Sequence, residues 1–202
     1  YMTLVSTALG YVIGLPLGVT LAVTGKGGIR ENKVVYRILD VISNVIRSIP
    51  FLILLILIIP LTRFLVGKSY GSSATIVPLV IAAAPFIARM VESSLQEVDE
   101  GVIEAAKSMG AGTWTIIFRV LLVEARTSLI VGVTIALGTI LGYSAMAGVV
   151  GGGGLGDIAI RYGYYRYQTD IMVVTIVILV LIVQVLQALG MMLSKKLDRR
   201  NK

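Results

Sequence analysis

Long apolar segments alternate with shorter polar segments along this chain. The apolar segments lie at about 2–24, 41–61, 74–91, 128–150 and 171–193. A helix needs about 20 apolar residues to cross a bilayer, and each segment reaches or approaches that length. A spanning helix satisfies its own backbone hydrogen bonds, whereas spanning strands would show weak alternation over about ten residues. The pattern predicts an all-α integral membrane protein with five transmembrane helices.

The polar segment at about 95–127, between the third and fourth spans, carries its own helix signals. Glu97, Asp99 and Glu100 are acidic residues at the start of a short helix, where they favour the positive end of its dipole. Gly110 suits the left-handed residue that ends a helix, and Thr113 is placed to cap a second one. We predict a helix, a sharp turn and another helix.

This predicted element has a small and partly apolar surface. Ala105 and Ala106 give it a low-profile face, with Val102, Ile103 and Trp114 beside them. Such a face can enter a groove on a partner protein. An amphipathic helix that lies on its own bundle or on the lipid interface is the alternative, and periodicity does not choose between them.

Composition supports the membrane assignment and removes several kinds of chemistry. Hydrophobic residues make up 56% of the 202 residues and charged residues 14%, with a mean hydropathy of +0.92. Soluble domains carry about 25% charged residues. We therefore expect one membrane domain over 1–194, followed by a basic tail at 195–202. The sequence has no Cys and no His, which excludes a disulfide framework and disfavours a zinc site or a membrane enzyme.

The basic residues predict the orientation. The larger set on one side of the spans comprises Lys26, Arg30, Lys33, Arg37, Arg47, Arg89, Lys107, Arg119, Arg126, Lys195, Lys196, Arg199, Arg200 and Lys202. Only Arg63, Lys68, Arg161 and Arg166 fall on the other side. The positive-inside rule places the larger set, the C-terminus and the polar segment at 95–127 in the cytoplasm, and the N-terminus outside. The basic residues form no stripe with interleaved aromatics, so the net charge of +7 does not indicate nucleic-acid binding.

Two glycine-containing motifs resemble nucleotide loops but lack the required context. Gly67-Lys68-Ser69 ends like a phosphate-binding loop, yet Thr62 stands where its first glycine belongs. The run at 151–156 matches a dinucleotide fingerprint in spacing, but it follows a membrane span instead of a strand. We interpret that run as a tight turn or re-entrant segment. We therefore reject both motifs as nucleotide sites.

Glycine and proline mark the predicted spans. Gly10, Gly14 and Gly18 recur at four-residue intervals, which favours close helix packing over a ligand role; Gly132 with Ala136, and Gly138 with Gly142, repeat that spacing. Pro50, Pro60, Pro78 and Pro85 are expected to kink or end helices. Pro85 and Arg89 are candidates for a lined pathway, although Arg89 could equally extend to the cytoplasmic interface.

The polar segment at about 95–127 also carries the signature of a known family. The sequence resembles the membrane-spanning subunits of ATP-binding-cassette importers, whose cytoplasmic signature runs E-A-A, three residues, G, nine residues and I-x-L-P. Glu104, Ala105, Ala106, Gly110 and Leu122 match that signature, while Val120 stands for Ile and Val123 for the usual Pro. The Val123 departure weakens the expected break after the second coupling segment.

Further motifs resemble the methionine-importer permeases in particular. These motifs are Arg47-Ser48-Ile49-Pro50-Phe51, Ile76-Val77-Pro78-Leu79, Ala84-Pro85-Phe86-Ile87-Ala88-Arg89-Met90, Gly142-Tyr143-Ser144-Ala145-Met146 and Gly153-Gly154-Leu155-Gly156. The resemblance implies a type I importer permease fold in the bacterial inner membrane. It also implies a homodimer, two cytoplasmic ATPase subunits that bind ATP and Mg, and an external methionine-binding protein or lipoprotein, with no cofactor in this chain.

The resemblance also assigns roles to residues. Glu104, Ala105, Ala106, Met109 and Gly110 would form the coupling helix on which the ATPase docks. Tyr143, Ser144 and Met146 join Pro85 and Arg89 as candidates for the pathway or gate, because a flexible thioether such as that of Met146 can repack against substrate or apolar neighbours. The substrate would be D- or L-methionine or a related small amino acid.

An ATP-independent secondary transporter or channel is the main alternative. It predicts acidic residues within the spans for ion coupling, and none of the 11 Asp and Glu residues falls clearly mid-span. The chain begins Tyr1-Met2 directly in an apolar stretch without a charged n-region, so we expect the natural N-terminus to be missing or trimmed.

Overall fold

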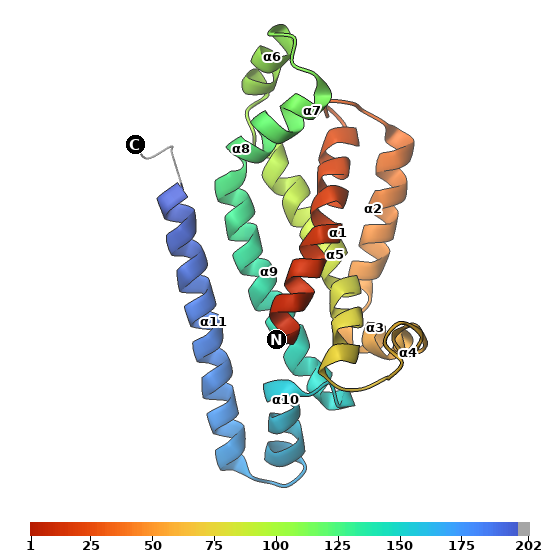
Figure 1. Cartoon of the computed structure of the whole chain (residues 1–202), viewed down its shortest axis with the longest axis vertical. Coiled ribbons are helices and arrows are strands. Elements are labelled where there is room, and N and C mark those ends of the chain that lie inside the picture. The colour runs from red at the N-terminus through yellow and green to blue at the C-terminus, as the bar shows by residue number, and fades with distance from the viewer. Residues whose placement is uncertain (198–202) are drawn as a thin grey trace.

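Four long apolar helices and their short continuations dominate the fold. The computed structural model describes residues 1–197, which are helical with no strand in that range (Figure 1). The long helices are α1 (Met2–Thr24), α5 (Ser72–Gln96), α9 (Arg126–Met146) and α11 (Thr169–Leu197). The shorter elements are α2 (Lys33–Ser48), α3 (Phe51–Leu57), α4 (Ile59–Val66), α6 (Glu100–Ser108), α7 (Thr113–Thr115), η1 (Ile116–Leu121), α8 (Leu122–Glu124), η2 (Ala147–Val150), α10 (Gly154–Ile158) and η3 (Ala159–Tyr164). The predicted all-α fold is confirmed, and of the basic tail expected at 195–202, residues 198–202 lie outside the described residues.

The second apolar segment is bent instead of straight. Four membrane-crossing helices become five only when α2 and α3, which meet at an angle of 102°, are taken as one broken span. Asn32 caps the start of α2 by accepting hydrogen bonds from two backbone N–H groups. The helix ends because Ile49 precedes Pro50 and adopts an extended conformation, with φ −81° and ψ 123°. The break expected at Pro50 is confirmed, and it divides the apolar segment at 41–61 in two.

Arg47 lies at the far end of α2 from Lys33. The 16 residues of α2 extend about 24 Å at 1.5 Å per residue, so the two basic residues cannot share one loop. Placing Arg47 on the same side of the spans as Lys33 was wrong, because α2 continues from Lys33 to Ser48 without a break. The remaining basic residues keep the same bias, and the orientation stays a prediction.

Helices α1 and α5 form the closest pair in the bundle. Gly10, Gly14 and Gly18 are all buried on the side of α1 that faces α5. A Cβ on Gly14 would lie 2.7 Å from the Ala84 carbonyl oxygen, and one on Gly18 would lie 2.4 Å from that of Ala88. The glycine spacing thus serves backbone approach, as predicted. In α9 the corresponding small residues have more room, since a Cβ on Gly142 would meet no atom within 4 Å.

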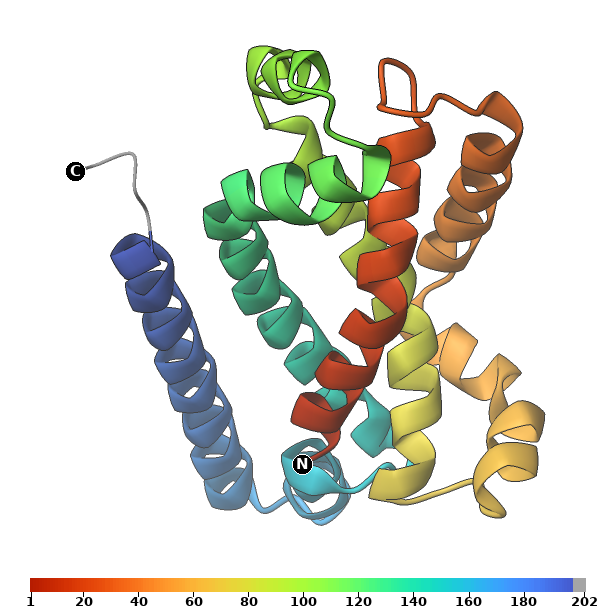
Figure 2. The same cartoon turned by 45° about the horizontal axis from the view of Figure 1, so that its top comes forward.

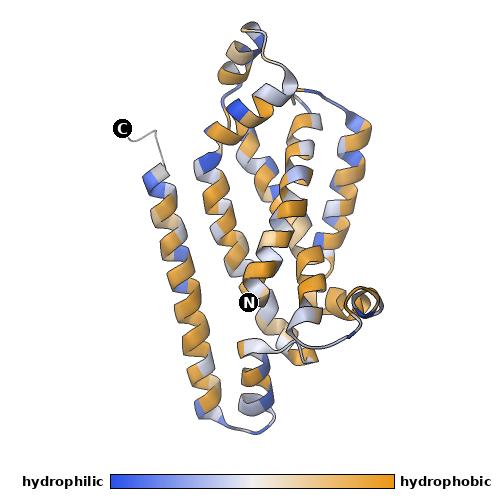
Figure 3. Cartoon of the chain, in the orientation of Figure 1, coloured by the Kyte–Doolittle hydropathy of each residue, from blue (hydrophilic) through white to orange (hydrophobic). Residues whose placement is uncertain are grey.

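Helix α11 lies at one side of the bundle and packs mainly on α9 and η3 (Figures 1 and 2). Its close approaches are local: Gly190 lies against the Thr134 side chain of α9, and Gly163 of η3 lies against Met172. Most of its other apolar residues are exposed, and Figure 3 shows hydrophobic residues along nearly its whole length. Such a surface is typical of a helix that faces lipid.

The glycine run at 151–156 forms a tight turn between η2 and α10. Gly151, Gly153 and Gly154 have φ values of 74°, 77° and 79°, which side chains disfavour. The Gly152 N–H donates to the Ala147 carbonyl at 2.9 Å, and the Gly71 N–H donates to the Gly151 carbonyl at 3.0 Å. The prediction of a turn here is confirmed.

Candidate functional site

Helix α6 stands beyond the ends of the long helices, at the end of the bundle where α11 finishes (Figure 1). The Asp99 side chain caps its start by accepting from the Gly101 N–H at 2.7 Å. Gly110 follows its end with φ 78°. The Gly110 N–H donates to Lys107 O at 2.9 Å and the Ala111 N–H to Ala106 O at 3.0 Å, which is the Schellman arrangement of a helix end. The predicted left-handed stop at Gly110 is confirmed.

The residues of the signature do not all face the same way. Glu104, Ala105 and Met109 are exposed, with Met109 80% accessible, whereas Ala106 is 4% accessible and belongs to the apolar core. Ala106 thus holds α6 against its own chain, at η1. Glu104, Ala105 and Met109 stay accessible, and docking of a partner on them stays a prediction.

A second exposed apolar surface follows in α7 and η1. The rings of Trp114 and Phe118 stack with centroids 6.0 Å apart, and they are 74% and 59% exposed. Thr113 does not cap this helix as predicted, because Gly112 occupies the cap position and no side chain bonds there. Figure 2 shows the segment from α7 to α8 running across the direction of α9. The break before α9 forms at Ala125, although Val123 replaces the usual proline.

Three adjoining cavities form a groove along α5. A cavity of about 360 Å³ at the α6 end shares Ser94, Glu97 and Ser128 with a second cavity of about 330 Å³. The second shares Arg47 and Phe86 with a third of about 210 Å³. Because the cavities share lining residues, they follow one face of α5 from its polar end toward α3.

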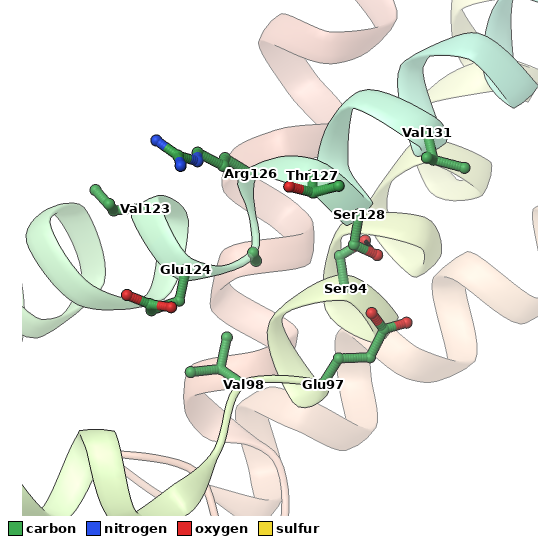
Figure 4. Close-up of a pocket in the computed structure, with 10 residues that line it drawn as sticks. Ser94, Glu97, Val98, Val123, Glu124, Arg126, Thr127, Ser128 and Val131 are labelled. Atoms are coloured by element: carbon green, nitrogen blue, oxygen red, sulfur yellow. Dashed lines mark hydrogen bonds between the residues drawn. The ribbon is translucent and has the colours of Figure 1, made fainter. Parts of the chain in front are cut away.

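The lining of the groove changes from polar to aromatic. At the polar end the Ser128 hydroxyl donates to the Ser94 hydroxyl at 3.0 Å, and Figure 4 shows these residues facing each other with Glu97 one turn away. At the other end Phe51 and Tyr143 stack in parallel, with centroids 4.7 Å apart and an interplanar angle of 4°. A small solute with one polar and one apolar end would therefore meet both kinds of surface.

Arg89 connects α2 to α5 at the middle of the groove. Its guanidinium pairs with Asp40 of α2, donates to Glu92 at 2.6 Å and donates to Asn44 at 3.1 Å. The Arg89 side chain is 19% exposed and that of Glu92 only 5%. The carboxylates hold Arg89 within the bundle, so the structure does not support its extension to the interface.

Comparison with known proteins places the chain in a family. Residues 14–202 match the family of binding-protein-dependent transport system inner membrane components. The chain belongs to this family. It is accordingly a multi-pass inner-membrane protein and a transport subunit, not an enzyme.

Individual members of this permease family are similar over most of the chain. The probable D-methionine transport system permease protein MetI of Vibrio cholerae is 50% identical over 99% of this chain and 89% of its own length. The methionine import system permease protein MetP of Bacillus subtilis is 46% identical over 89% of this chain and 81% of its own. A structure of the MetNI methionine ABC transporter in inward-facing conformations matches with a TM-score of 0.97 and 49% identity, over 98% of this chain and 92% of that one.

The candidate gate residues of this permease occupy different surroundings. Tyr143 lines the aromatic cavity, and Arg89 lines the middle one. Ser144 is buried away from them, where it donates to the Leu141 carbonyl at 2.8 Å and bonds the Thr3 hydroxyl at 3.3 Å. Met146 is 47% exposed, and Pro85 is buried within α5. The structure thus brings only Tyr143 and Arg89 into the groove, and a gating role for any of the five stays a prediction.

Sequence reasoning missed the partners of Arg89. Asp40 and Glu92 lie just outside the predicted spans at 41–61 and 74–91, so neither counted as an acidic residue within a span. The helical spacing of Arg89 and Glu92, three positions apart, was an available signal. No comparable signal in the sequence indicated the pairing of Arg89 with Asp40, which lies 49 positions away.

Removing the Asp40 carboxylate should loosen α2 in this permease. We expect Asp40→Asn to lower the free energy of unfolding by about 1.5 kcal/mol, the scale of a hydrogen bond to a charged group. Thermal unfolding in detergent, followed by size-exclusion chromatography, measures the change. Asp157→Asn is the control, because its partner Arg161 is 57% exposed and such pairs contribute only a few tenths of a kcal/mol. Equal effects of the two variants would contradict a specific role for the α2–α5 pair.

Proposed function

We propose that this chain is the permease subunit of an ATP-driven, binding-protein-dependent importer of methionine or a related small amino acid. The observation that carries the proposal is its 49% identity and TM-score of 0.97 to the MetNI methionine transporter over 98% of the chain. Similarity to D-methionine and methionine permeases from different bacteria supports the same substrate class. Either enantiomer fits this proposal.

The proposed assembly contains two copies of this chain and two ATPase subunits. The ATPases dock on α6 through the exposed Glu104, Ala105 and Met109, while Ala106 and Gly110 set the shape of that helix. ATP and Mg bind to the ATPases. A binding protein or lipoprotein delivers methionine at the opposite, outer end of the bundle, near the N-terminus.

Transport follows an alternating-access cycle in this proposal. ATP binding brings the two ATPases together and displaces α6, which rests on η1 through Ala106. The displacement passes through η1 and α8 to α9, so the long helices rearrange between inward-facing and outward-facing states. ATP and the loaded binding protein supply the free-energy difference, because each binds one state better than the other.

Reconstitution with the ATPase and binding protein tests this function. In proteoliposomes, methionine-loaded binding protein should stimulate ATP hydrolysis several-fold and drive uptake of labelled methionine. Uptake by the permease alone, without ATP, would instead support the secondary transporter or channel. A response to other amino acids but not to methionine would refute the substrate and leave the importer class intact.

A further inference from the structure

Arg47 is an unneutralised charge on the wall of the groove. It lies in the last turn of α2, at the break of the bent span, and it lines both the middle cavity and the aromatic cavity. Within residues 1–197 its side chain forms no salt bridge and no hydrogen bond, whereas Arg89 on the same groove pairs with Asp40 and Glu92. An ionisable residue within a membrane-spanning bundle is costly and marks a pathway by default. Arg47 is therefore available to an anionic group that enters the groove.

The aromatic cavity next to Arg47 suits a thioether. Its volume of about 210 Å³ lies below the range of about 300 to 1,000 Å³ that is usual for drug-sized ligands, which matches a small amino acid. Phe51, Phe86 and Tyr143 line it together with the aliphatic Leu54 and Ala82. The sulfur of a thioether makes favourable contacts with aromatic rings. A methionine side chain would meet an apolar wall here.

The two features together define a site for one class of molecule. We infer that Arg47 binds the carboxylate of an α-amino acid while its thioether side chain occupies the cavity lined by Phe51, Phe86 and Tyr143. A planar guanidinium binds a carboxylate through two parallel hydrogen bonds, which fixes the direction of the bound molecule. This site rests on the proposed function for its ligand, and it would give the permease a selectivity of its own.

The bound molecule would leave toward the polar end of the groove. Ser93, Ser94 and Ser128 provide hydroxyls along the middle and polar cavities, and Glu97 provides a carboxylate that suits an ammonium group. The carboxylate of the bound molecule therefore meets the cation of Arg47, and the molecule then passes the serine hydroxyls on its way to the polar end.

A single thiol in the aromatic cavity can report occupancy. The chain has no cysteine, so Ala82→Cys introduces the only one. The purified complex with its ATPase is treated with N-ethylmaleimide. The increase in the mass of this chain over time measures the rate at which the thiol is alkylated. L-methionine should slow the reaction, and methioninol, which keeps the thioether but lacks the carboxylate, should not do so at the same concentration. Ser93→Cys in the middle cavity is a second reporter, in case Ala82→Cys does not assemble.

Arg47→Gln in the reporter background tests the charge. It should raise the methionine concentration for half-maximal protection by about tenfold, as expected for loss of a charge-assisted pair, and Arg47→Lys should raise it less. Arg63→Gln is the matched control, because Arg63 is exposed like Arg47 but lines none of the three cavities. Unchanged protection with Arg47→Gln, or equal protection by methioninol, would overturn the inference. The inference would also be overturned if methionine did not protect the reporter thiol although the wild-type complex takes up methionine. If the wild-type complex did not take up methionine, the proposed function would be refuted instead.

Discussion

Gly110→Val is expected to release the ATPase subunits from the permease. Gly110 has φ 78°, and an L-residue in that conformation costs roughly 1–2 kcal/mol, with β-branched residues among the least tolerated. The hydrogen bonds from Gly110 to Lys107 and from Ala111 to Ala106 depend on this backbone. The end of α6 should therefore shift, and the amount of ATPase that co-purifies with the tagged permease should fall about tenfold, since about 1.4 kcal/mol corresponds to a factor of ten in binding.

The matched control for this prediction lies two residues away. Gly112 has φ −71° and ψ 162°, and a Cβ there would meet no atom within 4 Å. Gly112→Val introduces the same side chain on the same loop, so it should leave co-purification close to wild type. If both variants retained the ATPase, or both lost it equally, the left-handed stop of α6 would not be the feature that docking requires.

Gly18→Ala is expected to destabilise the packing of α1 on α5. A Cβ at Gly18 would lie 2.4 Å from the Ala88 carbonyl oxygen and 2.6 Å from Val91 Cβ, so α1 and α5 must separate. Overpacking of this kind costs typically 1–3 kcal/mol, and the backbone atom in the contact places this site toward the upper end. Alanine gains about 1 kcal/mol over glycine within a helix, which leaves a net loss of about 2 kcal/mol. Thermal unfolding of the detergent-solubilised permease measures it.

Gly138→Ala in α9 separates packing from helix propensity. A Cβ at Gly138 would lie 3.8 Å from the Gln187 amide nitrogen, which is an ordinary contact. This variant gains the same propensity without a clash, so its thermal midpoint should equal or exceed that of the wild type. A loss of stability at Gly138 as large as that at Gly18 would show that close approach of α1 to α5 is not the cause.

The pattern of apolar and polar residues along the chain was enough to identify the long helices. Spans at 2–24, 74–91, 128–150 and 171–193 lie within or close to helices of the structure, because unbroken apolar runs in a membrane have no other way to satisfy their backbone. The stop at Gly110 and the turn at 151–156 were also predictable, since glycine conformation is a local property. The bend at Pro50 was partly predictable: the proline signals a break, but its angle of 102° depends on how α3 packs on α5.

The sequence by itself determined the fold class, the family and the signature segment of this permease. Only the tertiary structure decided which residues of that segment are exposed, since Ala105 and Ala106 are adjacent and identical, yet Ala105 is exposed and Ala106 is buried. It also decided that Arg89 is neutralised by Asp40 while Arg47 has no partner within residues 1–197. The physical reason is that charge pairing and burial depend on distances between helices far apart in sequence, and periodicity within one helix contains no information about them.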